Sequence, residues 1–309
     1  MGLDHVCPIC HRESVHDRSV PDWGEMRCCP SCRLVFANPM TLPESPESFY
    51  SKAYRGFSEY AGMEDYSRRI SGSINKANKG SIDSERIHFC GARADAMTWI
   101  KENISPGSVV LDIGCATGYF PRLLRKNGFM AVGLEVAKEC VDMLTDEGFQ
   151  IWHGTIDSIP YNWNQPVLCT TFFVLHHLPD PVGFLATIRS KFPNANLLVG
   201  VWNRFPSPQR ISAASLPPRT LTWWSPQSLQ KAMEKAEYQV DSVSELIHPY
   251  EFGMPRVTRG RFTMWARSSG HYRLLSIYYA VKPKVVWPWR FWKRLTGKPS
   301  SVLARGKPC

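Results

Sequence analysis

The chain of 309 residues contains no run of eighteen apolar residues, so we expect no segment of it to cross a membrane. Its first residues, Met1–His5, lack the basic and apolar regions of a secretory signal. Neither end carries a lipidation motif, because Val6 stands where myristoylation needs Ser or Thr and Cys309 is the last residue. These absences, with no internal repeat or low-complexity tract, favour a cytoplasmic protein with one α/β domain and appendages.

Acidic residues are also missing from the C-terminal region. No Asp or Glu follows Glu251, whereas 13 Lys and Arg do, so the first 251 residues hold 24 basic and 27 acidic groups. The net charge of +10 therefore belongs to the last 58 residues. Indoles and cations are interleaved between Val285 and Leu295, a composition that suits an anionic membrane interface, RNA, or a solvated tail packing aromatics on the domain.

Among these three, we predict peripheral contact of the tail after Pro283 with an anionic membrane, which would keep the protein at the membrane surface. The aromatic residues between Trp287 and Trp292 lie too close together, with Pro288 among them, to form a base-stacking platform along one strand. They fit a short wedge in the headgroup layer, with the flanking cations left in water. RNA is the second choice of partner for this tail.

Cysteines are concentrated at the N-terminus in two C-x-x-C pairs with 18 residues between them. This spacing is close to that of a four-thiolate zinc ribbon, and disulfides are disfavoured in a cytosolic chain. We therefore predict one structural Zn²⁺, bound by Cys7, Cys10, Cys29 and Cys32. Cys28 can compete with Cys29, but only Cys29 gives the C-x-x-C step with Cys32. His5, His11 and His16 are alternatives by residue type.

The stretch Val109–Gly118 organises the rest of the chain. Its apolar, β-branched run does not alternate with polar residues, as expected of a parallel strand that is buried on both faces. It ends in Asp112 and then enters a turn of small residues, Gly114 to Gly118, with a helix expected from about Tyr119. Such a helix directs its N-terminal dipole at whatever the turn binds.

Four ordered segments together carry a family resemblance. Asp112 to Gly118 resembles motif I of the class I S-adenosylmethionine-dependent methyltransferases, with Ala116 at the position of the middle glycine. Glu135 closes a second strand, and the resemblance implies that it binds the ribose hydroxyls. Asp157 matches the acid near the adenine amino group. The fourth segment, Val174–Pro181, resembles the signature after strand four in the ubiquinone and menaquinone type of small-molecule methyltransferases. The resemblance implies these cofactor-binding residues: Asp112, Gly114, Cys115, Ala116, Gly118, Glu135 and Asp157.

The candidate catalytic residue is His177. It follows the fourth strand, at the carboxyl edge of the sheet where the pocket must lie, and it can act as a general base if the acceptor is a hydroxyl. The alternative is that His177 only orients the loop. His176 stands where relatives keep Glu and is expected to face the cofactor. Gln165–Pro166 replaces the usual Asp before strand four, so no role is assigned there.

The resemblance implies a Rossmann-like α/β fold, a seven-stranded class I methyltransferase sheet with helices on both faces, plus a small N-terminal zinc ribbon. We expect four regions: zinc ribbon 1–40, connector or lid 41–83, methyltransferase domain 84–283 and basic aromatic tail 284–309. Residues 204–222 are expected to form an irregular, proline-rich insertion. The list of expected elements is helices 84–104, 181–191 and 227–236, strands 130–135, 150–153, 167–173, 196–201 and 238–246, and a final antiparallel strand at 273–281.

The activity implied is methyl transfer from S-adenosylmethionine to a hydroxyl or carbon of a small or lipid-linked metabolite. The segment Arg33–Pro39 resembles one that follows such ribbons in methyltransferases of bacterial saccharide and natural-product pathways, so a saccharide intermediate is the first choice. One alternative is an RNA base methyltransferase that holds RNA with its ribbon and tail. Another is a non-catalytic, zinc-containing binding subunit, for which Ala116 and the missing Asp are the only support.

Overall fold

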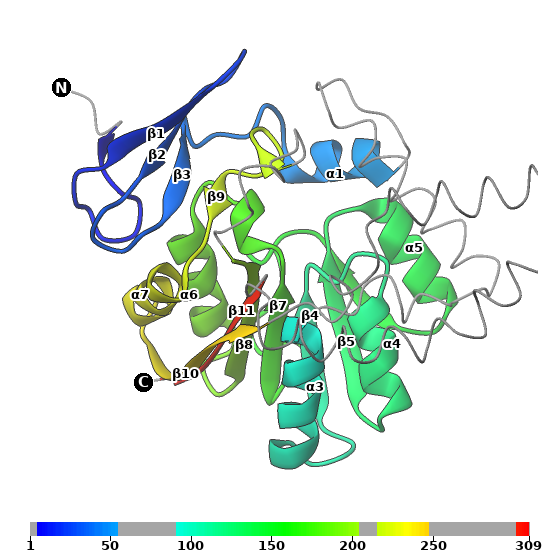
Figure 1. Cartoon of the computed structure of the whole chain (residues 1–309). Coiled ribbons are helices and arrows are strands. Elements are labelled where there is room, and N and C mark those ends of the chain that lie inside the picture. The colour runs from blue at the N-terminus through cyan, green and yellow to red at the C-terminus, as the bar shows by residue number, and fades with distance from the viewer. Residues whose placement is uncertain (1–4, 55–90, 204–214, 247–300, 309) are drawn as a thin grey trace, which may run out of the picture.

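The computed structural model describes residues 5–54, 91–203, 215–246 and 301–308. These residues form two sheets, a small antiparallel one near the N-terminus and a larger one with helices packed on both faces (Figure 1). Within the described ranges, no helix has the length and apolar character needed to cross a bilayer.

The larger sheet has seven strands in the order β10-β11-β8-β7-β4-β5-β6. β11 is antiparallel to both of its neighbours, and the other six strands run in one direction. The predicted fold is thereby confirmed. The strands are β4 (Val109–Ile113), β5 (Met130–Glu135), β6 (Gln150–His153), β7 (Leu168–Phe172), β8 (Asn196–Trp202), β10 (Tyr238–Leu246) and β11 (Ser301–Pro308).

Helices bury the apolar side chains of both sheet faces. On one face, Val110 and Leu303 pack with α3 and α4; on the other, Leu111 and Ala304 pack with α6 and α7. This division follows from the two-residue period of a strand, which sends neighbouring side chains to opposite faces. The helices are α3 (Gly91–Asn103), α4 (Tyr119–Lys126), α5 (Lys138–Asp146), α6 (Pro181–Lys191) and α7 (Pro226–Lys235).

The position of the last strand differs from the prediction. The predicted strand, residues 273–281, lies outside the described residues, and the antiparallel place between β8 and β10 is held by Ser301–Pro308. This strand was missed because Gly306 and Pro308 are residues that argue against a strand. Gly306 fits a close-packed place, because a Cβ there would lie 2.8 Å from the Met233 methyl and that side chain would have to move. The end of the predicted tail is therefore part of the sheet.

The small sheet contains β1 (Val15–Val20), β2 (Gly24–Cys28), β3 (Val35–Asn38) and β9 (Thr222–Trp223). β9 was not predicted, since residues 204–222 were expected to be irregular. It pairs with β3, so the ribbon sheet is completed by a strand from the far part of the sequence, as Figure 1 shows. Ile9 and Leu34 of the ribbon share one buried core with Trp224 and α7. The ribbon is thus packed onto the larger sheet rather than tethered to it.

The connector contains a helix, α1 (Pro46–Tyr54), that lies over the carboxyl edge of the large sheet (Figure 1). Its Tyr50 packs against Ala137 and Cys140 at the start of α5, and Ala116 of the turn after β4 packs against the same two residues. This part of the connector therefore lies beside the turn after β4. The remainder of the predicted connector, residues 55–83, lies outside the described residues.

Candidate functional site

The turn between β4 and α4 places three alternate residues in the left-handed conformation. Their φ angles are 73° at Gly114, 49° at Ala116 and 76° at Gly118. A Cβ at Gly114 would lie 2.4 Å from Val174, and one at Gly118 would lie 2.2 Å from Leu144, so both positions require glycine. Ala116 adopts the conformation that glycine would, and the substitution therefore keeps the shape of the turn while leaving backbone strain of about 1 kcal/mol.

Glu135, at the end of β5, holds this turn in place. Its buried carboxylate accepts hydrogen bonds from three backbone amides: Ala116 at 2.7 Å, Val136 at 2.9 Å and Ala137 at 3.0 Å. Burial raises the pKa of Glu135, and the three amides oppose that rise. A carboxylate has about four lone-pair sites, so it keeps capacity for a further donor such as a ribose hydroxyl.

Asp112, at the end of β4, is buried and accepts a 2.7 Å hydrogen bond from the Thr170 hydroxyl on β7. Burial raises its pKa from 3.8 to about 7, against the opposing effects of Thr170 and the nearby Arg93 cation. The repulsion from Glu135 adds to the rise. Two buried carboxyls at one edge of the sheet attract positive charge, which fits a sulfonium cofactor with an amino group.

The raised pKa of Asp112 makes folding stability depend on pH. Between pH 3.8 and about 7 the unfolded chain ionises Asp112 while the folded chain keeps its proton, so stability falls as pH rises. Above about pH 7 we expect the free energy of unfolding to be lower than it is below pH 3.8 by the full amount, on the order of 4 kcal/mol. Denaturant unfolding of wild type and Asp112→Asn from pH 5 to pH 8 measures the upper two pH units of this loss, about 3 kcal/mol, because the asparagine cannot ionise.

The exposed Asp142→Asn variant is the control for that measurement, since its carboxylate sits at the surface beside Lys138. It should follow the wild-type curve. A constant difference between wild type and Asp112→Asn across the pH range would contradict the assignment.

The other predicted cofactor residues lie around the same edge. Cys115 is buried in the turn, and burial raises the pKa of its thiol well above the usual value, so it is not a nucleophile. Asp157 is exposed in the loop that follows β6, at the carboxyl edge. The geometry brings Asp112, Glu135 and the turn together and leaves Asp157 at the margin of this group.

His176 and His177 lie in a short 3₁₀ helix, η3 (Leu175–His177), that directly follows β7. Both rings are buried, and their centroids are 3.9 Å apart. Nδ1 of His177 donates to the Arg219 carbonyl, since a carbonyl can only accept. This bond fixes the tautomer in which Nε2 carries the lone pair.

Burial keeps both imidazoles neutral. It lowers the pKa of His177 to about 3, with a further contribution from the Arg219 cation, and it lowers the pKa of His176 well below 6.5. Nδ1 of His176 has no hydrogen-bond partner among the described residues. Tyr50 of α1 packs edge-on against His177, with ring centroids 5.6 Å apart. His177 is therefore a neutral acceptor beside α1.

Sequence reasoning missed two further features of this edge. Arg93 of α3 lies over the rings of Tyr119, Phe172 and Phe173, at 5.3 to 5.7 Å from their centroids. Trp202, at the end of β8, stacks on Phe173 with ring centroids 4.3 Å apart. Arg93 lies within the predicted helix 84–104, where only apolar spacing was considered. The signal that could have identified it was the presence of a cation on that helix.

The four predicted metal ligands come together. One sulfur from each of Cys7, Cys10, Cys29 and Cys32 lies within 4.8 Å of every other, with Cys7–Cys32 at 3.5 Å and Cys10–Cys29 at 3.4 Å. Four thiolates at about 2.3 Å from Zn²⁺ span edges of about 3.8 Å. The cluster thus fits a tetrahedral ion and can hold zinc, and Cys28 is not part of it.

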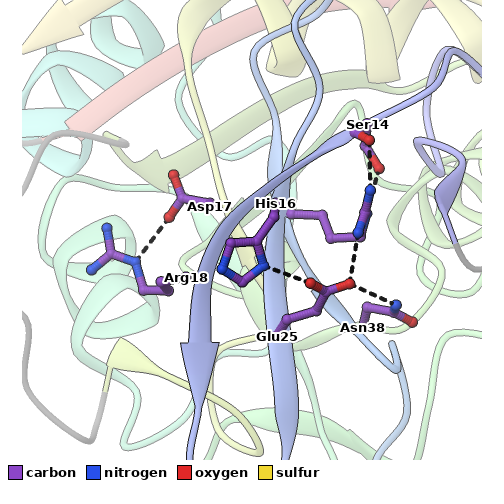
Figure 2. Close-up of polar contacts among 7 residues, drawn as sticks. Ser14, His16, Asp17, Arg18, Glu25 and Asn38 are labelled. Atoms are coloured by element: carbon purple, nitrogen blue, oxygen red, sulfur yellow. Dashed lines mark hydrogen bonds and ion pairs between the residues drawn. The ribbon is translucent and has the colours of Figure 1, made fainter.

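The histidine alternative for the metal site is not supported at His16. Figure 2 shows its ring on the strand surface of the ribbon, where Nδ1 lies 2.6 Å from the Glu25 carboxylate. The same carboxylate accepts from Arg27 at 2.7 Å and from Asn38 at 3.3 Å. These donors lower the pKa of Glu25 to about 2. His16 belongs to this polar network and not to the cysteine cluster.

Comparison with known proteins agrees with this geometry. A family model described as "Methyltransferase domain" matches residues 83–243, just over half of the chain. A search of curated proteins found no match.

Among solved structures, one similar chain comes from the complex between the Haloferax volcanii Trm112 methyltransferase activator and a methyltransferase. It has a TM-score of 0.50 and 17% identity, with 76% of this chain and 97% of that chain covered. A methyltransferase from Aquifex aeolicus that depends on S-adenosylmethionine has a TM-score of 0.43 and 20% identity, with 56% and 92% covered. The 1,6-didemethyltoxoflavin-N1-methyltransferase of Burkholderia thailandensis has a TM-score of 0.48 and 13% identity, with 95% and 100% covered.

Proposed function

This chain belongs to the methyltransferase domain family, so it is an S-adenosylmethionine-dependent methyltransferase, and we propose that its acceptor is a hydroxyl or carbon of a small or lipid-linked metabolite. A saccharide intermediate is the first candidate. The observation that carries the proposal is His177, a neutral imidazole whose Nε2 lone pair is fixed at the carboxyl edge by the bond from Nδ1 to the Arg219 carbonyl.

The residues proposed for the cofactor are those gathered at the ends of β4 and β5. Glu135 is assigned to the ribose hydroxyls, Asp157 to the adenine side and the turn from Gly114 to Gly118 to the amino acid part. Asp112 supplies a negative charge near the cofactor's cations. Arg93 is proposed to pair with the carboxylate of the cofactor. These assignments explain why two buried acids and one cation converge on the turn after β4.

The chemistry asks little of the protein beyond positioning. The sulfonium methyl group is already activated, so the chain must hold the acceptor in line with the S–CH₃ bond and exclude water. With a hydroxyl acceptor, Nε2 of His177 accepts the hydrogen bond of the hydroxyl and takes its proton as the C–O bond forms, when that proton has become acidic enough for an imidazole whose pKa is about 3 to hold it. α1 helps to exclude water, because Tyr50 packs edge-on against His177 and also packs against Ala137 and Cys140, which Ala116 of the turn contacts from its own side.

The test combines cofactor binding with a product search. We expect calorimetry to show one S-adenosylmethionine site, and mass spectrometry of extracts to show a product heavier by one methylene only with the active protein. His177→Ala should lose the product while keeping cofactor affinity within about twofold, because removing a general base costs about 10²- to 10⁴-fold in rate. A product formed equally by His177→Ala would exclude its role as base.

We also propose that the four cysteines hold one structural Zn²⁺. Four thiolates leave no open coordination position, which is the arrangement of structural rather than catalytic zinc. The ribbon residues buried in the core shared with α7 include three of the ligands, Cys7, Cys29 and Cys32, which supports a stabilising role for the ion because metal binding then contributes directly to folding.

For the basic segment that follows Pro283, we propose peripheral contact with anionic membrane, with RNA as the alternative partner. The support is its composition, in which cations flank clustered indoles. Measuring the binding of the chain to acidic vesicles and to RNA distinguishes membrane from RNA as the partner of this segment. The variants should replace Trp287, Trp289 and Trp292 and keep the chain intact, because β11 follows this segment.

A further inference from the structure

The segment Arg219–Trp223 is bonded on two sides. Toward the ribbon, β9 pairs with β3 through Val35↔Trp223 and Phe36↔Thr222, and the Ala37 amide donates to the Leu221 carbonyl at 2.7 Å. The same segment therefore takes part in the sheet that the cysteine cluster supports.

Toward the large sheet, the segment holds η3. The Leu221 amide donates to the His176 carbonyl at 2.7 Å, and the Thr222 hydroxyl donates to the Leu175 carbonyl at 3.3 Å. Nδ1 of His177 donates to the Arg219 carbonyl. Each residue of η3 thus has a hydrogen bond to the Arg219–Trp223 segment.

The cysteine cluster is joined to β3 by short backbone links. The Cys29 amide donates to the Leu34 carbonyl at 2.8 Å, and the Arg33 amide donates to the Cys29 carbonyl at 2.9 Å. The Ser225 hydroxyl, just past β9, donates to the Cys32 carbonyl at 3.3 Å. The position of the second cysteine pair therefore fixes where β3 begins and how β9 lies on it.

We propose that metal bound at the four cysteines positions His177 for methyl transfer, through β3 and β9, while cofactor affinity stays independent of the metal. This inference rests on the proposed role of His177. Thr222 is a positioning residue in it, because its hydroxyl joins β9 to η3. The turn of the cofactor site is held by Glu135 from β5. Among the described residues, no hydrogen bond joins that turn to the ribbon.

The physical reason is that Cys7, Cys29 and Cys32 are themselves among the ribbon residues buried in the core shared with α7. Without the ion, four sulfurs packed within 4.8 Å lose their common ligand and the second cysteine pair loses its fixed geometry. β3 and β9 then lose their register, since β9 is only two residues long. The Arg219 carbonyl moves with β9, and His177 loses the bond that sets its tautomer.

The experiment uses the full chain labelled with ¹⁵N-histidine and reads the ring nitrogens by NMR. His177 signals are identified by their loss in His177→Gln, since the chain has nine histidines. Cys29→Ser removes a proposed ligand, and Cys28→Ser is its matched control. Thr222→Val removes the hydroxyl bond to η3 with little change of volume, and Thr187→Val on α6 is its control. Zinc content and calorimetric S-adenosylmethionine affinity are measured for each.

We expect wild type and both controls to show one Zn²⁺ and His177 with the proton on Nδ1. Cys29→Ser and Thr222→Val should show mixed tautomers at His177, with its pKa rising from about 3 toward 6.5. Cofactor affinity should stay within about twofold in all four variants. An unchanged His177 spectrum in either test variant would overturn the inference.

Two arms keep this result separate from the proposed function. Should Cys29→Ser fail to fold, wild type with Cd²⁺ in place of Zn²⁺ decides the matter, because its longer bonds to sulfur widen the cluster. A displaced His177 Nδ1–H signal supports the coupling, and an unchanged one overturns it. Absence of S-adenosylmethionine binding in wild type would instead contradict the proposed cofactor site.

Discussion

Removal of residues 301–309 should yield a chain without a cooperative unfolding transition. β11 lies between β8 and β10, and it pairs with β10 along its length and with β8 from Ser301 to Gly306. Val302, Leu303 and Ala304 are fully buried, on both faces of the sheet. Loss of their burial and of the backbone hydrogen bonds costs on the order of 10 kcal/mol, as much as the whole stability of a typical domain.

Single substitutions give the matched comparison. Leu303→Ala should keep the fold and lower the free energy of unfolding by about 2 to 5 kcal/mol, because it leaves a cavity in a closed core. Lys307→Ala, at the exposed end of β11 beside Asp241, should change it by less than about 0.5 kcal/mol. Urea unfolding followed by circular dichroism measures all three. A truncated chain with the wild-type midpoint would show that β11 is dispensable.

This result bears on any assay of the basic tail. A chain that ends at Pro283 loses β11 together with the clustered tryptophans, so its failure to bind vesicles would report unfolding as well as lost contact. From the sequence, the sheet and the basic tail were assigned to separate regions. In the structure, however, the last eight described residues, Ser301–Pro308, form a strand of the sheet.

The inner parallel strands β4, β5, β7 and β8 were readable in the sequence because both of their faces are buried, and the edge strand β6 was found with them although none of its residues is fully buried. β5 and β6 were predicted with the bounds that the structure has, and β4, β7 and β8 within one or two residues. Helix starts were readable where a side chain caps them: Asp180 accepts from the Gly183 amide at 2.8 Å, and Ser225 accepts from the Ser228 amide at 3.2 Å. Local chemistry sufficed in each case.

β9 and β11 could not be predicted because their partners are distant in the chain. A strand of two residues, Thr222–Trp223, has no periodicity to detect, and its bonds to β3 and η3 involve mostly backbone groups that carry no residue signal. β11 ends in glycine and proline and is selected by the space between β8 and β10. Tertiary context decided both.

The candidate site divides in the same way. Asp112, Glu135 and the four cysteines stand in spaced motifs, and the structure brings each group together. The motif predicts the place of His177 after β7, but its tautomer depends on the carbonyl of Arg219, 42 residues later in the chain. Such a contact comes from the fold alone.

Glu135→Ala is expected to have the largest effect on cofactor binding of any single substitution at this edge. It leaves the buried amides of Ala116, Val136 and Ala137 without acceptors, which should lower the free energy of unfolding by about 3 kcal/mol. The turn loses its anchor, and a ribose hydroxyl loses its proposed acceptor. The binding free energy of S-adenosylmethionine should weaken by about 1 to 3 kcal/mol, which lowers its affinity roughly 5- to 150-fold.

Glu135→Gln tests separately the two effects of Glu135→Ala, on the turn and on the ribose hydroxyl. Its single carbonyl oxygen can serve the neighbouring amides of Val136 and Ala137, while its NH₂ group faces the Ala116 amide and repels it. We therefore expect a loss of about 1 to 3 kcal/mol in stability, less than for the alanine, with displacement confined to the turn. The exposed Glu234→Ala on α7 is the control and should bind the cofactor as wild type does. Calorimetry and urea unfolding measure both quantities, and wild-type affinity in Glu135→Ala would place the cofactor away from the β4–α4 turn.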